Sequence, residues 1–99
     1  MICEDLKGGR VLVTGASSGI GSAAASLFSK QNCYVGVHYF RTPEGAEKTL
    51  EQVKKNSDGI LLRADVRDEK QVEQMVEQFA DKAGGIDILI NNAGLYMRA

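Results

Sequence analysis

Short apolar runs alternate along the chain with longer stretches in which apolar residues recur every three or four positions. Four runs are rich in β-branched or aliphatic residues, which is typical of buried strands; they span residues 10–14, 34–39, 60–64 and 86–91. Between the first two runs the recurrence predicts a helix. Its predicted apolar face is formed by Ile20, Ala23, Ala24, Leu27 and Phe28.

Two further helices are predicted between the later strands. Thr42 followed by Pro43 predicts an N-cap and a proline at the first helical position. Asp68 and the glutamine three residues later resemble a capping pair at the start of a strongly amphipathic stretch. The pair Gly84-Gly85 predicts the end of that helix, since glycine is common at helix C-termini.

The predicted element order is β-α-β-α-β-α-β. Alternation of this kind implies parallel strands with helices on both faces, because right-handed crossovers cover the sheet. We therefore expect an α/β fold, a Rossmann-type doubly wound parallel sheet with strand order 3-2-1-4. Since such sheets continue past the fourth strand, residues 1–99 are expected to form an incomplete dinucleotide-binding domain, truncated after that strand.

The strongest chemical signal is the turn between the first predicted strand and the first predicted helix, Thr14 to Gly21 (TGASSGIG). In a dinucleotide-binding turn, Gly15 allows a tight bend, Gly19 lets the backbone approach a pyrophosphate, and Gly21 permits close helix packing. The helix N-terminus adds N–H groups and a positive dipole end. A flexible turn is the simpler alternative, but a strand before and a helix after are the required context. Further hydrogen bonds can come from the hydroxyls of Ser17 and Ser18.

This turn resembles the glycine turn of the short-chain dehydrogenase/reductases, and two further motifs support the resemblance. Asp65-Val66 follows the third predicted strand. Asn91 to Gly94 (NNAG) follows the fourth, about 70 residues after the glycine turn. The resemblance covers the entire chain, and three motifs in register are specific. A P-loop is excluded, because the turn contains no Gly-Lys-Ser/Thr.

The resemblance implies a set of cofactor-binding residues. Asp65 would accept a hydrogen bond from the adenine amino group, with Val66 stacked against the ring, whereas Asn91 would tie neighbouring strands together. The residues implied at the cofactor phosphates are Gly15, Ser17, Ser18, Gly19, Ile20 and Gly21. Those implied on the ribose side near the nicotinamide are Asn92, Ala93 and Gly94.

The end of the second predicted strand bears on the choice of nicotinamide cofactor. An NAD-selective site usually places a carboxylate there, but residues 33–43 contain no Asp or Glu. Tyr39 or its neighbour Phe40 fills the expected position, and the guanidinium of Arg41 can pair with a phosphate. We therefore predict NADP(H) over NAD(H), with a solvated loop arginine as the alternative. The glycine turn departs from the pattern of many NADP-preferring members, since two serines stand where those carry Arg or Lys.

The catalytic groups that the resemblance implies are missing from this sequence. The family uses a Tyr-x-x-x-Lys pair and a serine, beyond NNAG, and no lysine follows Tyr34, Tyr39 or Tyr96 at that spacing. We therefore expect no catalytic residue in this chain. The implied activity is hydride transfer between a nicotinamide and a small carbonyl or alcohol substrate.

An uncovered fourth strand would be an apolar sheet edge, which aggregates or pairs with another chain. The first interpretation is therefore the cofactor-binding half of a longer oxidoreductase. The alternatives are a non-catalytic nucleotide-binding or assembly module that pairs through this strand, as a homo-oligomer or with a partner, and a truncated product that folds poorly.

Composition and charge narrow the remaining classes. Twelve Lys and Arg against 13 Asp and Glu give a net charge of −1, which predicts no binding to nucleic acid or anionic membranes. No apolar run exceeds three residues, so a transmembrane helix is excluded, and no apolar segment predicts a secretory signal. Cys3 and Cys33 predict neither a disulfide framework nor a metal site. His38, the single histidine, is expected to pack or face solvent in a cytoplasmic protein.

Overall fold

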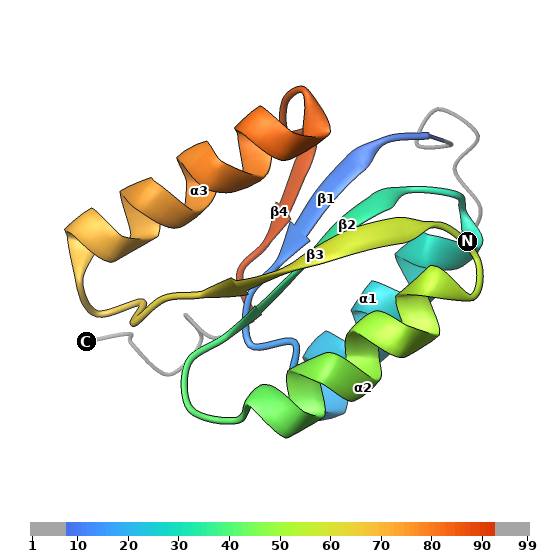
Figure 1. Cartoon of the computed structure of the whole chain (residues 1–99), viewed down its shortest axis with the longest axis horizontal. Helices are drawn as coiled ribbons and strands as arrows, with labels where there is room; N and C mark the ends of the chain where they lie inside the picture. Colours follow the sequence, from blue (N-terminus) through green and yellow to red (C-terminus); the bar gives the residue numbers. More distant parts are fainter. Residues whose placement is uncertain (1–7, 93–99) are drawn as a thin grey trace.

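Four parallel strands form one sheet in the order β3-β2-β1-β4 in the computed structural model, which describes residues 8–92 (Figure 1). The strands are β1 (Arg10–Val13), β2 (Tyr34–Tyr39), β3 (Asp58–Arg63) and β4 (Ile88–Ile90). The helices are α1 (Gly19–Lys30), α2 (Pro43–Lys54) and α3 (Glu69–Ala83). The predicted fold class, element order and strand order are confirmed.

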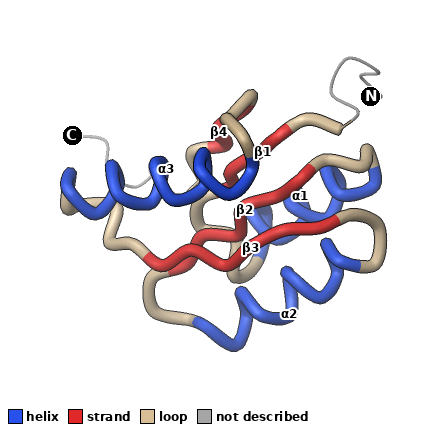
Figure 2. The backbone as a smooth tube through the Cα atoms, turned by 45° about the horizontal axis from the view of Figure 1, so that its top comes forward, coloured by secondary structure: helices blue, strands red, loops and turns tan. Residues whose placement is uncertain are grey.

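Helices cover both faces of the sheet, with α1 and α2 on one face and α3 on the other (Figure 2). Successive residues of a strand point to opposite faces, so β1 supplies both cores: Leu12 points toward α3, and its two neighbours point toward α1 and α2. The buried residues on the α1 and α2 side are Val11, Val13, Ala16, Ala25, Cys33, Val35, Val37, Ala46 and Val53. Those on the α3 side are Leu12, Leu62, Ala64, Met75 and Phe79.

The predicted helix ends are confirmed at three positions. Thr42 is the N-cap of α2 with Pro43 in its first turn, and Gly84 ends α3 with a left-handed φ of 86°. The Asp68 carboxylate caps α3 by accepting hydrogen bonds from the N–H groups of Lys70 and Gln71. Within residues 8–92, no helix is both long enough and apolar enough to span a membrane.

The predicted apolar face of α1 is partly wrong. Ile20 is 75% exposed and Leu27 is 57% exposed, and Ala23 is also exposed. Ala24 and Phe28 do pack against the core, as predicted. The side that faces inward carries small residues, which let the helix lie close to the sheet and turn the larger side chains outward; these residues are Gly21, Ala25 and Ser29.

The bounds of three strands also differ from the prediction, and β1 already ends at Val13. β3 begins two residues earlier, at Asp58, and β4 is limited to Ile88–Ile90 instead of residues 86–91. Just before β4, the Arg10 backbone N–H donates to the Asp87 carboxylate at 2.8 Å, and the Asp87 N–H donates to the Arg10 carbonyl at 2.8 Å. Asp87 therefore pairs with β1 and does not guard an open edge.

Candidate functional site

The glycine turn connects β1 to α1 at the carboxyl end of the parallel strands. Gly15 and Gly19 have φ values of 63° and 60°, a left-handed region that strongly favours glycine. A Cβ added at Gly21 would lie 2.1 Å from the Gly15 carbonyl oxygen, so α1 packs directly on the turn. A Cβ added at Gly19 would meet nothing within 4 Å, so the outer side of the turn is open.

The N-terminus of α1 opens onto this side of the turn. Its N-cap residue, Ser18, makes no side-chain capping hydrogen bond, and the first turn contains no acidic residue. Ser18, Gly19 and Ile20 are exposed, whereas Ser17 is half-buried. Backbone N–H groups at a helix N-terminus bind anions, since they carry the positive end of the helix dipole. The turn therefore fits the pyrophosphate of a dinucleotide.

Neighbouring elements hold the glycine turn in place. On the α2 side, the buried Thr49 hydroxyl donates to the Ala16 carbonyl at 2.8 Å. On the β2 side, the Ala16 N–H donates to the His38 carbonyl at 2.9 Å. The Asn92 side chain donates to the Gly15 carbonyl at 3.1 Å. The turn is thus fixed from three directions.

Asp65 and Val66 follow β3 at the same edge of the sheet, as predicted. The Asp65 carboxylate accepts hydrogen bonds from Nε and an Nη atom of Arg67, each at 3.0 Å, and these bonds lower its pKa. Its backbone N–H donates to the Gln71 side chain at 2.8 Å. Val66 is half-buried and lines a pocket of about 240 Å³ together with Thr14, Val72, Met75, Val76, Leu89 and Asn91.

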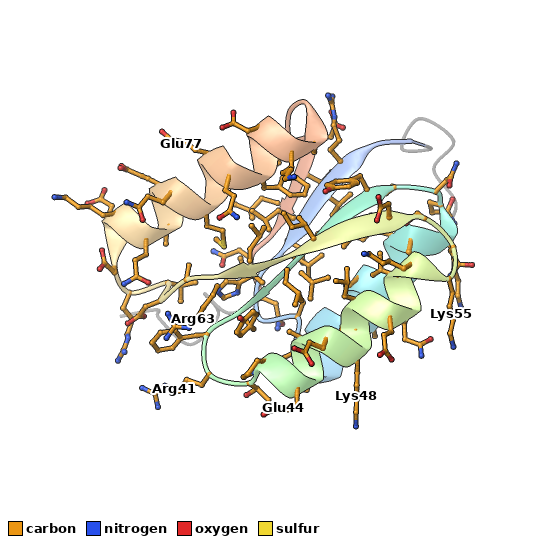
Figure 3. All side chains as sticks on the ribbon, viewed as in Figure 1. Arg41, Glu44, Lys48, Lys55, Arg63 and Glu77 are labelled. Atoms are coloured by element: carbon orange, nitrogen blue, oxygen red, sulfur yellow. The ribbon has the colours of Figure 1, made fainter. Side chains whose placement is uncertain are left out.

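A cluster of two arginines around one aromatic ring lies at the ends of β2 and β3. The guanidinium carbons of Arg41 and Arg63 lie 5.3 and 5.1 Å from the centroid of the Phe40 ring. Figure 3 shows both arginines at one end of the molecule, far from Lys55. Tyr39 is half-buried and packs against the core. Arg63 could not be recognised from the sequence, because only strand pairing brings it beside Phe40.

The two asparagines after β4 connect this strand to β1. The Thr14 hydroxyl lies 3.2 Å from the Ile90 carbonyl and 3.4 Å from Oδ1 of Asn91, which agrees with the structural role expected for Asn91. Asn92 also has a tethering contact, to Gly15, which the sequence did not predict. Two further predicted cofactor-binding residues, Ala93 and Gly94, lie outside the described residues.

His38 is buried, with 2% of its surface exposed, so it packs inside the protein and does not face solvent. Its Nδ1 accepts a hydrogen bond from the Gly15 N–H at 2.8 Å, and its Nε2 lies 2.8 Å from the Ala64 carbonyl. These contacts of His38 could not be predicted from the sequence, because both partners use backbone atoms.

Known proteins share both the sequence and the fold of this chain. The profile of the short chain dehydrogenase family matches residues 9–99. Glucose 1-dehydrogenase 2 of Bacillus subtilis is 37% identical over 92 residues, which are 92% of this chain and 36% of that protein. A dehydrogenase/reductase structure from Sinorhizobium meliloti superposes with a TM-score of 0.84 at 32% identity, covering 88% of this chain and 35% of the other.

The chain belongs to the short-chain dehydrogenase family. It spans about a third of the length of the two relatives above. Another relative, the short-chain dehydrogenase/reductase homolog YusS of Bacillus subtilis, is 36% identical over 85 residues, which are 85% of this chain and 78% of that protein.

Within residues 8–92, no group of three His, Cys, Asp or Glu residues could hold a metal ion. Burial raises the pKa values of the Cys33 thiol and the Tyr34 hydroxyl, which disfavours their reactive anions. Cys3 and Tyr96 lie outside the described residues.

Proposed function

We propose that this chain is the cofactor-binding part of an oxidoreductase that transfers a hydride between a nicotinamide dinucleotide and a small carbonyl or alcohol substrate. The main support is the open, uncapped N-terminus of α1 behind the Gly15–Gly21 turn. The nicotinamide supplies the hydride chemistry when bound, and the protein supplies its position. This chain contributes no proton-transfer residue.

In this proposal the carboxyl edge of the sheet holds the cofactor at three places. The N–H groups of the glycine turn bind the pyrophosphate. Asp65, which Arg67 holds in its ionised form, accepts a hydrogen bond from the adenine amino group, and Val66 contacts the ring. Asn92, which follows β4, lies on the side of the ribose next to the nicotinamide.

We further propose that the site prefers NADP(H). Neither Arg41 nor Arg63 forms an ion pair with another described residue, so each guanidinium can pair with a phosphate. The charge of Arg41 does act on Asp65, since it adds to the larger effect of Arg67 in lowering the pKa of that carboxyl. A 2′-phosphate carries close to two negative charges at neutral pH and pairs well with guanidinium groups. Residues 33–43 contain no carboxylate that would repel it.

Fluorescence titration of the full chain with NADPH and NADH tests this proposal. We expect tighter binding of NADPH, and a difference that shrinks about tenfold in Arg41→Ala, because a charged hydrogen bond is lost. Lys55→Ala is the matched control, since it removes the same charge at the far end of α2 (Figure 3). Equal affinities in the parent would contradict the NADP(H) preference, and failure to bind either would contradict the proposed function.

A second candidate function is a non-catalytic assembly module that pairs through β4. The supporting observation is the surface of this strand, since Leu89 is 50% exposed and the nearby Ile86 is 37% exposed. Among the described strands, β4 pairs with β1 alone. Sedimentation over a range of concentrations should then show a dimer that Leu89→Lys dissociates. A monomer at all concentrations would exclude self-association.

A further inference from the structure

One buried imidazole connects the two loops to which the proposed function assigns the cofactor. Gly15, in the pyrophosphate-binding turn, donates to Nδ1 of His38, and Ala64, next to the adenine-binding Asp65, lies against Nε2. We infer that His38 is a positioning residue that fixes these two loops relative to each other, and that only its neutral form does so. This inference rests on the proposed function.

The two hydrogen bonds define a single state of the ring. A backbone N–H only donates, so Nδ1, which faces the Gly15 N–H, must carry a lone pair. A carbonyl oxygen only accepts, so Nε2, which faces the Ala64 oxygen, must carry the hydrogen. The imidazole is therefore neutral with its hydrogen on Nε2.

This imidazole belongs to a line of hydrogen bonds that crosses the carboxyl ends of all four strands. After β4, Asn92 donates to the Gly15 carbonyl at 3.1 Å. After β1, the Gly15 N–H donates to His38, which donates in turn to Ala64 after β3. Asp65 follows directly in the chain. The line thus joins the glycine turn, the loop that contains Asp65, and Asn92.

Protonation of His38 would break this line at Gly15. A second ring N–H would then face the Gly15 N–H, and two donors repel each other. Burial lowers the pKa of His38 from the ordinary value of 6.5, while its bond to Ala64 acts in the opposite direction. The neutral ring therefore predominates at neutral pH, and the break occurs only at more acidic pH.

The groups around His38 bring no charge that would favour the imidazolium. Leu62 is its register partner on β3. On this face α3 contributes the buried, uncharged Met75 and Phe79 to the same core as Leu62. The charged residues on either side of Ala64 in the chain are engaged elsewhere, Arg63 over the Phe40 ring and Asp65 with Arg67. At the end of β2, Arg41 likewise lies over Phe40.

The relative position of the two loops matters because one dinucleotide must contact both. A site held in its productive geometry binds more tightly than one that must be ordered first. Loss of the Gly15 contact would release the glycine turn from the loop that contains Asp65 and Val66. We therefore expect cofactor affinity to fall when His38 is protonated.

The experiment measures the dissociation constants of NADH and NADPH from pH 5 to pH 8 for the parent chain and for His38→Asn. The NADH series is essential, since the 2′-phosphate of NADPH itself titrates near pH 6. His38 is the single histidine, so no second histidine obscures the profile. Asparagine does not titrate; its Oδ1 replaces Nδ1 toward Gly15, and its side chain is too short to reach Ala64.

We expect NADH binding by the parent to be constant at neutral pH and to weaken about tenfold in acid. We expect His38→Asn to bind about tenfold more weakly at pH 8, because one bridging bond is lost, with no pH dependence. Phe79→Leu is the control for lost stability, and should keep the parental profile. A flat parental NADH profile, or the same acid loss in His38→Asn, would overturn the inference.

An NMR titration of the cofactor-free chain keeps the inference separate from the proposed function. The Gly15 and Asp65 amide signals should move with the same midpoint as the His38 ring, which should show the Nε2–H tautomer at neutral pH. Independent midpoints or the other tautomer would overturn the coupling. Failure of the parent to bind either nucleotide at pH 8, with coupled midpoints, would overturn the proposed function and the link to affinity, while the structural coupling would stand.

Discussion

Among the described residues, nine buried side chains form the core under α1 and α2, whereas five form the core under α3. The first core is spread over many small aliphatic residues, and the second is centred on the ring of Phe79, which lies 5.8 Å from that of Tyr34. A pocket beside Leu89 stays open on the α3 side. Thr49 ties the glycine turn to the first core, and His38 connects the turn to Ala64 in the second.

Removal of the Phe79 ring should have the largest effect and should separate the two cores. Phe79→Ala should lower the free energy of unfolding by about 3–5 kcal/mol, because the ring is fully buried in the smaller core. Val53→Ala, in the larger core, should cost about 2 kcal/mol. Chemical denaturation measures both. Equal costs would contradict the difference between the cores.

The glycine turn provides a second, smaller test with two matched substitutions. Gly21→Ala places a Cβ 2.1 Å from the Gly15 oxygen and should cost about 2–3 kcal/mol, because backbone must move. Gly19→Ala meets open space and should cost only about 1–2 kcal/mol, from its left-handed φ.

The order of the two variants in NADPH affinity should differ from their order in stability. Gly19→Ala adds a methyl group on the open side of the turn, so it should lose NADPH affinity although it remains folded at 25 °C. Thermal denaturation and NADPH titration, compared in the same buffer, measure the two effects. Unchanged NADPH binding in Gly19→Ala would contradict the assignment of this side to the cofactor.

The ion pair that ties β4 to β1 should have a small, pH-dependent effect. The side-chain hydrogen bonds from Arg10 lower the pKa of Asp87 from its ordinary value of 3.8. The contribution of the ion pair to the free energy of unfolding is therefore fully present above pH 3.8. It is lost as the pH falls through the lower, folded-state pKa of Asp87. The free energy of unfolding is measured at pH 7 and at pH 3 for the parent and for Asp87→Asn. Between these two pH values, Asp87→Asn should lose less of it than the parent does. An identical acid loss would indicate that the pair is not formed in solution.

The exposed side of β4 should show the smallest effect. Leu89→Ser should change the free energy of unfolding by no more than about 0.5 kcal/mol, because the side chain is half exposed. Urea denaturation at several protein concentrations measures it. A loss well above this value, or one that depends on concentration, would show that Leu89 is covered in solution and would favour the assembly alternative.

Local patterns predict the elements of this fold well, because strand runs, caps and glycines act over a few residues. The start of α2 at Pro43 and the end of α3 at Gly84 follow from such signals. The orientation of α1 on the sheet does not follow from local signals. Its small inward residues and its larger outward residues, Ile20 and Leu27, both recur with helical spacing. Close approach of the helix to the sheet decides between them, and that approach is a tertiary property.

The candidate site likewise has one part that local patterns predict and one part that depends on tertiary structure. The glycine turn and Asp65 are motifs read along the chain, and the structure brings both to one edge of the sheet. The positions of Arg63 and His38 depend on strand pairing. The partners of His38 lie 23 and 26 residues away from it along the chain, and the Phe40 ring beside Arg63 belongs to another strand end. A sequence lists these side chains but does not show what they face.

The most direct test of dinucleotide binding at the glycine turn is an amide NMR titration of the full chain with NADPH. We predict that shifted signals cluster at the carboxyl edge of the sheet, in residues 15–21, 38–41 and 64–66 and at Asn92, with little change along the outer side of α3. Shifts confined to α3 and β4, or no shifts at millimolar NADPH, would contradict it.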